Sequence, residues 1–178
     1  MTDRTNDHTT SASQTVLLAG IGPIPPCHPE RLYAPGIRLW SMAVALLEAG
    51  LRPDVFEVRF GEAAKGRAAS LHHVEYQADD EAKIATASLQ GESLRDMVAS
   101  ALAKGNYAAI VSTTDLVGAA CAQVVGELPF WCDLNGHPMT ERQGLSHRYE
   151  SDEGLASQWN DELPALLRAD RFSTCSGS

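Results

Sequence analysis

The sequence has too few basic residues for a protein that binds polyanions. Its 178 residues contain 14 Lys and Arg against 23 Asp and Glu, so the net charge at pH 7 is −9. Such a surface does not neutralise the phosphates of nucleic acids or of anionic lipids, which argues against both classes of partner. The chain also lacks an apolar run that approaches the roughly 18–20 residues of a membrane-spanning helix. We therefore expect no direct membrane span.

The first residues lack the apolar core of a secretory signal peptide. Residues 1–14 are rich in Thr, Ser, Asn and Asp, which predicts a disordered tail ahead of a single domain over residues 15–178. The four cysteines are Cys27, Cys121, Cys132 and Cys175. They form no C-x-x-C pair, and no pair of Cys or His has the spacing of zinc ligands. We expect free thiols in a reducing cytoplasm and no metal site.

Short apolar stretches alternate with amphipathic ones along the rest of the chain. Strands are predicted at residues 15–20, 54–60, 71–77, 107–112, 128–132 and 171–174. Helices are predicted at residues 36–49, 93–104, 116–125 and 154–167. Such alternation is typical of a parallel sheet with helices on both faces. The sequence therefore predicts an α/β fold, a Rossmann-like, doubly wound domain of three layers with a mostly parallel sheet.

Several boundaries depend on single residues. Gly50 is expected to end a helix, and Asp115 is expected to cap one. Pro164 is expected to kink or divide the last helix. Residues 61–70 are predicted as a loop, and residues 83–89 fit either a strand or the start of a helix.

The loop after the first strand is unusually long. Roughly fifteen residues join this strand to the next helix, where two to six are usual, and loops of that length tend to be functional. Gly20 and Gly22 fit the first two glycines of the dinucleotide fingerprint G-x-G-x-x-G, but the third falls on Pro25, so the usual NAD fingerprint fails. Four prolines stiffen the loop, which suits a segment that lines a ligand.

Three side chains near this loop are candidates for ligand contact. Arg38 lies in the first turn of the predicted helix, where a guanidinium and backbone N–H groups can bind a phosphate or a carboxylate. Alternatively, Arg38 pairs with a nearby acid such as Glu30. Cys27 and His28 are expected to contact ligand rather than to catalyse, because the sequence places no general base beside Cys27.

A second polar loop follows the predicted strand that ends at Cys132. Residues 133–143 contain Asp133, Asn135 and His137. Ligands bind at the carboxyl ends of strands in this architecture, so these three residues are candidates for binding. A histidine at such a place can donate a hydrogen bond or carry a proton near neutral pH, which makes His137 the candidate catalytic residue.

Several segments, taken in order, resemble the amino-terminal half of a GT-B glycosyltransferase of the family 4-like group. They are VLLAGIGP, GIRLWSMAVALLEAG, DVFEV, YAAIVSTT, PFWCDLNGHPMTERQ and ADRFSTCS. The resemblance covers most of residues 15–176. It implies two Rossmann-like domains that face each other across a cleft. The amino-terminal domain would mainly hold the acceptor, and the carboxyl-terminal domain would hold the nucleotide-sugar.

The resemblance also implies roles for individual residues. Gly20, Gly22 and Gly36 would lie toward the diphosphate of the donor, and His137 would contact the donor sugar. The nucleotide-sugar would be a co-substrate, with no further cofactor. The acceptor would be a carbohydrate or another hydroxyl compound.

The 178 residues do not include the donor-binding half that the resemblance implies, so we expect little or no activity from this chain alone. A donor-binding domain or a partner chain would complete a transferase. One alternative is a non-catalytic subunit that stabilises a partner glycosyltransferase, which predicts an exposed apolar patch. Another is a stand-alone small-ligand module, which predicts tight nucleotide binding by this chain alone.

Overall fold

The computed structural model describes residues 13–60, 67–76, 82–134 and 152–174. Their seven strands are β1 (Thr15–Ile21), β2 (Arg52–Phe60), β3 (Arg67–Tyr76), β4 (Ala82–Leu89), β5 (Ala109–Thr113), β6 (Phe130–Asp133) and β7 (Arg171–Ser173). The helices within these ranges are α1 (Ala34–Glu48), α2 (Leu94–Leu102), α3 (Asp115–Ala122) and α5 (Asp152–Arg168).

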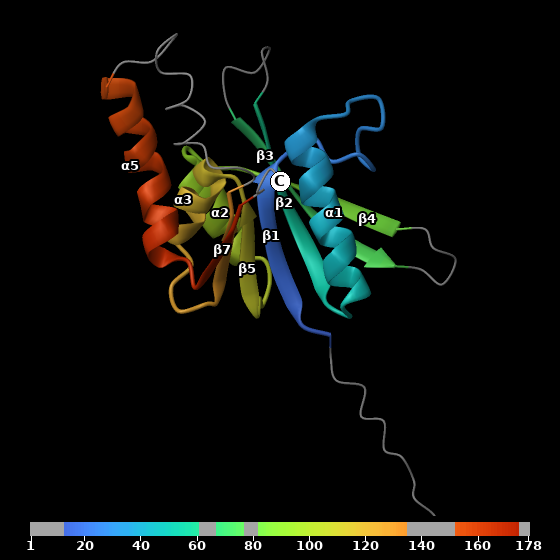
Figure 1. Ribbon diagram of the computed structural model, residues 1–178. Coiled ribbons are helices and arrows are strands. Elements are labelled where there is room, and N and C mark those ends of the chain that lie inside the picture. The colour runs from blue at the N-terminus through green and yellow to red at the C-terminus, as the bar shows by residue number, and fades with distance from the viewer. Residues whose placement is uncertain (1–12, 61–66, 77–81, 135–151, 175–178) are drawn as a thin grey trace, which may run out of the picture.

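The strands form one sheet in the order β4-β3-β2-β1-β5-β6-β7. β1 pairs in parallel with β2 on one side and with β5 on the other, and β6 and β7 continue the parallel part. β3 and β4 extend the sheet as antiparallel strands beyond β2. Figure 1 shows α1 on one face of the sheet and α2 and α3 behind it. The predicted fold class, a three-layer α/β domain with a mostly parallel sheet, is confirmed.

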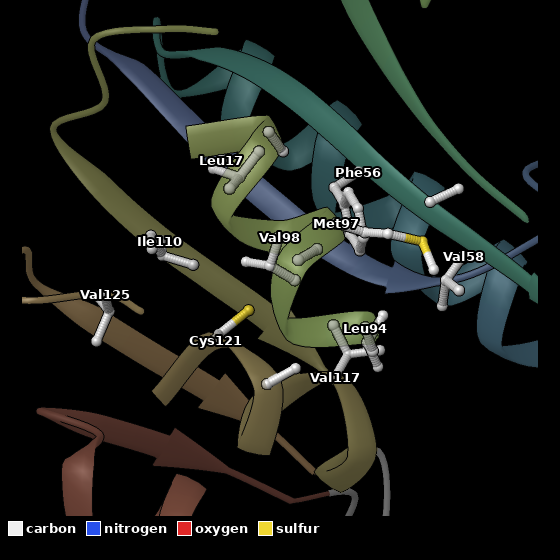
Figure 2. Packing of buried hydrophobic residues seen from close by; sticks show 14 of the residues in the cluster. Leu17, Phe56, Val58, Leu94, Met97, Val98, Ile110, Val117, Cys121 and Val125 are labelled. Carbon is white, nitrogen blue, oxygen red and sulfur yellow. The ribbon is translucent and has the colours of Figure 1, made fainter. Parts of the chain in front are cut away.

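Each face of the sheet has its own apolar core, and β1 contributes to both. Leu17 and Ala19 pack toward α2, α3 and α5, whereas Val16 and Leu18 pack toward α1. Figure 2 shows the first of these cores, in which Met97 of α2 lies close to Phe56 of β2. Successive residues of a strand point to opposite faces, so an apolar run without alternation is the pattern of a strand buried on both sides.

Local sequence explains where helices begin and end. The Ser93 hydroxyl accepts a hydrogen bond from the Asp96 N–H at 3.2 Å and so caps α2. Pro35 lies in the first turn of α1, where its missing N–H costs no hydrogen bond. Gly50 follows α1 with a φ of +77°, so the expectation that it ends this helix is confirmed.

The hairpin of β3 and β4 was only partly predicted. Residues 67–70, predicted as loop, begin β3, because they pair with β2 and bury Ala69 in the core. The ambiguity at residues 83–89 is resolved as strand β4, which pairs with β3. Most side chains of these segments are small or polar and have little intrinsic preference for strands. Tertiary contacts decide that the segments form strands, so the sequence did not predict the pairing.

One helix cap was predicted wrongly, and for Pro164 the predicted alternative of a divided helix is excluded. Asp115 is the first residue of α3, and the residue at the cap position is Thr114. Pro164 lies inside α5, which runs without division from Asp152 to Arg168. At the amino terminus, Ser13 and Gln14 belong to the described part and contact Gly50 and Arg52. The remainder of the predicted tail, residues 1–12, lies outside the described residues.

Candidate functional site

The direction in which successive strands are added to the sheet reverses between β1 and β5. From β1 the chain first builds toward β2, and later builds toward β5 and β6 on the opposite side. The carboxyl ends of these parallel strands therefore meet at one edge, where crossover connections leave a crevice. This carboxyl edge, formed by the ends of β1, β5 and β6, is the place where the fold favours a ligand.

The three predicted glycines come together at this edge. A Cβ atom at Gly20 would overlap the Thr113 hydroxyl, and one at Gly22 would overlap the side chain of Glu57. At Gly36 a Cβ would overlap the carbonyl oxygen of Pro23. The glycines thus let α1 and the loop after β1 approach the strand ends closely, which a larger residue would prevent.

Arg38 and Asp133, two of the predicted contact residues, bind each other. Arg38 Nε lies 2.5 Å from Asp133 Oδ2, and Arg38 Nη2 lies 2.7 Å from Oδ1. The Ser173 hydroxyl donates to Oδ1 as well, at 2.7 Å. Asp133 is completely buried, whereas the Arg38 side chain is 32% exposed. Of the two alternatives for Arg38, the structure therefore has the ion pair, with Asp133 rather than with Glu30.

The end of β5 contributes residues that sequence reasoning missed. Thr114 adopts a φ of 78°, which is unfavourable for a β-branched residue, and its N–H donates to the Asp133 carbonyl at 2.7 Å. The hydroxyls of Thr113 and Thr114 are buried and find no hydrogen-bond partner within the described ranges. The signal was present in the sequence as a polar Ser-Thr-Thr run that ends an apolar strand.

A hollow of about 320 Å³ opens beside the carboxyl end of β1. It is lined by Ile21, Gly22 and Pro23 of the turn after β1 and by Arg31 and Tyr33. The Gly22 N–H donates to the Val58 carbonyl at 2.9 Å, which holds this turn against β2. Tyr33 is 45% exposed, so its ring is available to a ligand. Neither Arg31 nor Tyr33 was among the predicted site residues.

A second polar cluster lies under the same loop, over β2 and β3. Glu57 is fully buried, and its Oε2 accepts a hydrogen bond from the Ile24 N–H at 3.0 Å. Arg59 Nε lies 3.0 Å from Glu57 Oε1, and His72 Nε2 lies 3.4 Å from Oε2. The loop and the two strands therefore share one buried carboxylate.

The predicted contact residues Cys27 and His28 belong to this cluster. Cys27 Sγ lies 3.7 Å from Nδ1 of His72. The statement that no general base stands beside Cys27 was therefore wrong, because strand pairing brings His72 to it from a distant part of the chain. Arg59 Nη1 donates to His28 Nε2 at 3.2 Å.

Opposing effects set the ionisation of this cluster. Burial raises the pKa of the Glu57 carboxyl, but His72, the Ile24 N–H and Arg59 outweigh it, and the net pKa lies below the ordinary value. The pKa of the Cys27 thiol is raised, mainly by burial and also by the Glu57 carboxylate, while Arg59 opposes the rise. The resting cluster therefore contains a carboxylate and a protonated thiol.

The remaining predicted site residues, Asn135 and His137, lie outside the described residues.

Cys121 and Cys132 are buried free thiols, as expected, and Cys27 is a partly exposed one. Within the described ranges, no group of three or more His, Cys, Asp and Glu is arranged to hold a metal ion. None of the described helices is long and apolar enough to cross a membrane.

Comparisons with models of protein families, with curated proteins and with solved structures found no match.

Proposed function

We propose that this chain is the acceptor-side half of a glycosyltransferase that transfers a sugar from a nucleotide-sugar to a hydroxyl group. The observation that carries the proposal is the hollow beside β1, where an aromatic residue, Tyr33, lies together with Arg31 and the Gly22 turn. A ring against which apolar C–H faces can pack, next to hydrogen-bonding groups, suits a carbohydrate.

Charge at the carboxyl edge supports an alcohol rather than a free nucleotide as the ligand of this half. The positive charge of Arg38 is compensated by Asp133 and that of Arg59 by Glu57, which leaves Arg31 as the one guanidinium of this region without an ion pair among the described residues. A site for a diphosphate on its own needs uncompensated donors and positive charge. Neutral hydroxyl groups need only hydrogen-bond partners, which the residues that line the hollow, Arg31 and Tyr33 among them, can supply.

The diphosphate would be held mainly by a donor-binding domain or a partner chain. The turn at Gly20 and Gly22 and the first turn of α1 at Gly36 would face that half across the cleft. Catalysis would come from orienting acceptor and donor, with His137 as the candidate group that carries a proton. No cofactor beyond the nucleotide-sugar is needed, and the free thiols suit the cytoplasm.

The decisive experiment titrates this chain with a panel of mono- and disaccharides and, separately, with UDP and GDP, while amide chemical shifts are recorded. We expect a saccharide to perturb residues of the hollow and neither nucleotide to bind tightly. Tyr33→Ala should weaken saccharide binding by roughly tenfold. Leu32→Ala is the matched control, because Leu32 is 76% exposed and does not line the hollow. Tight nucleotide binding without saccharide binding would instead identify a stand-alone nucleotide module.

A non-catalytic subunit is the second candidate, and an apolar groove favours it. Met42 and Leu46 of α1 and Val111 and Trp131 of the sheet line a hollow of about 260 Å³. Trp131 is 39% exposed there. Purification from the native host under mild conditions separates the two candidates. An active complex with a chain that carries a sugar-nucleotide domain supports the transferase half if Tyr33→Ala lowers transfer by roughly tenfold, and the subunit if transfer is unchanged.

A further inference from the structure

We propose that Cys27, His72 and Glu57 form a nucleophile, general base and positioning carboxylate that transfer an acyl group from an ester or thioester to the Cys27 sulfur. This activity goes beyond the proposed glycosyl transfer and does not depend on it. The three residues come from the loop after β1, from β3 and from β2, and they lie on the face of the sheet that α1 covers.

The order of the three groups is the order that nucleophilic catalysis requires. Glu57 is ionised, and its carboxylate lies 3.4 Å from Nε2 of His72, an ion-pair distance that favours the ring proton on Nε2. Nδ1 then carries the ring's lone pair, and both the Thr86 hydroxyl at 2.8 Å and Cys27 Sγ at 3.7 Å face it. A base that is itself oriented by a third group and faces a nucleophile is the arrangement that activates thiols and hydroxyls.

Strand register explains why the pair of Glu57 and His72 is fixed. Val55 of β2 is the direct partner of His72, so Glu57, two residues further along β2, is its diagonal neighbour on the same face. Thr86 of β4 is also paired with His72, and its hydroxyl lies 2.8 Å from Nδ1. Thr86 therefore holds the imidazole plane from the side opposite to β2.

Two further features suit an acyl transfer. Cys27 is the partly exposed thiol of the described chain, whereas Cys121 and Cys132 are buried. The Arg59 guanidinium contacts both Glu57 and His28, and its positive charge acts on Cys27. A cation beside the nucleophile can stabilise the negative oxygen that forms when the thiol adds to a carbonyl.

The step is balanced without an added reagent. Nδ1 of His72 takes the thiol proton while the Cys27 sulfur forms a bond to the carbonyl carbon. The bond from that carbon to the leaving oxygen or sulfur then breaks, and His72 returns the proton to the leaving group. The products are a thioester on Cys27 and a free alcohol or thiol. Because the raised pKa of Cys27 leaves little thiolate at neutral pH, the base is required.

The test uses p-nitrophenyl acetate as the acyl donor and intact-protein mass spectrometry with peptide mapping as the readout. Every sample carries Cys175→Ser, so that acetylation at Cys27 is compared with the two buried thiols. We expect acetylation at Cys27, none at Cys121 or Cys132, and a rate at least about tenfold lower in His72→Gln. His73→Gln is the matched control, because the neighbouring His73 faces Asp54 instead, at 2.8 Å. Equal rates in the His72→Gln and His73→Gln proteins, or no acetylation of Cys27, would overturn the proposal.

A second measurement avoids the risk that His72→Gln disturbs the fold. In the chain with intact His72, a base-assisted rate levels off above the range in which histidines titrate. An unassisted thiolate reaction instead rises about tenfold per pH unit up to the titration of the thiol. A plateau supports the proposal, and a continuous rise overturns it.

Discussion

The guanidinium of Arg38 and the carboxylate of Asp133 face each other through two contacts, at 2.5 and 2.7 Å, and so join the second turn of α1 to the last residue of β6. α1 covers one face of the sheet, and β6 is separated from β1 by β5 in the sheet order. Two-point contacts between arginine and a carboxylate are among the stronger protein hydrogen bonds. The pair thus fixes the crevice between these strand ends and also removes net charge from it.

Replacing Arg38 by Gln should lower the free energy of unfolding by about 2 kcal/mol. That value is below the ~3–5 kcal/mol for a fully buried pair, because the Arg38 side chain is 32% exposed. Stability falls because the Asp133 carboxylate stays buried but loses the guanidinium, and keeps the hydrogen bond from the Ser173 hydroxyl. Urea unfolding measures the change, with exposed Arg95 on α2 replaced by Gln as control. Equal losses in the two variants would contradict a structural role of the pair.

Gly36→Ala should destabilise the protein by about 1–3 kcal/mol, although alanine normally favours helices over glycine. The new Cβ would overlap the Pro23 carbonyl oxygen, so α1 must move away from the loop after β1. Thermal unfolding compares this variant with Gly50→Ala, where no atom lies within 4 Å of the added Cβ and only the φ of +77° is unfavourable. A more stable Gly36→Ala protein would show that the contact gives way easily.

Glu57 should contribute stability that depends on pH. Its pKa is lower in the folded chain than its ordinary value of 4.5, because His72, the Ile24 N–H and Arg59 outweigh the effect of burial. The unfolded chain therefore binds this proton first, so the stabilisation is present above about pH 4.5 and is lost as the pH falls through the folded pKa. Unfolding free energies across this range should fall less steeply with decreasing pH in Glu57→Gln. Glu48→Gln, at an exposed position of α1, should keep the slope of the parent chain.

Tyr107 should give the opposite dependence at alkaline pH. Its hydroxyl donates to Asp54 Oδ2 at 3.0 Å, and burial together with the Asp54 carboxylate raises its pKa well above 10. Stability from the neutral phenol is complete below about pH 10 and is lost as the pH rises through the folded pKa. Tyr107→Phe should cost about 1–2 kcal/mol at neutral pH and remove this alkaline loss. Tyr33→Phe, at an exposed tyrosine, is the control, and an equal alkaline loss in both variants would contradict the assignment.

Patterns that depend on neighbours in sequence predicted the parallel part of the fold well. The apolar residues of β1 and the Ser93 cap of α2 are local signals, and the structure has both elements. The first residues of β3 were missed because Ala68, Ala69 and Ser70 have no strong preference for strands. These residues form a strand because they pair with β2, and no local sequence pattern predicts that pairing.

The candidate site shows the same division between local and distant information. Gly20, Gly22 and Gly36 were singled out by the resemblance to glycosyltransferases, and the structure shows a close approach at each of them. Sequence spacing could not predict the contact of Arg38 with Asp133 or that of Cys27 with His72. The partners lie in β6 and β3, far along the chain from Arg38 and Cys27. Arg31 and Tyr33 carry no local signal that distinguishes them from other loop residues.

The two polar sites of this chain should also differ in when they form during folding. β2, β3 and β4 follow one another along the chain and pair with their immediate neighbours, whereas β1 must find β5 across everything that lies between them. Contacts between sequence neighbours close small loops and are kinetically favoured. Glu57 and His72 can therefore meet within an early hairpin, while Arg38 and Asp133 meet only once the whole sheet is assembled. A destabilised chain would then lose the crevice at the carboxyl edge first and retain the neighbourhood of His72 longest.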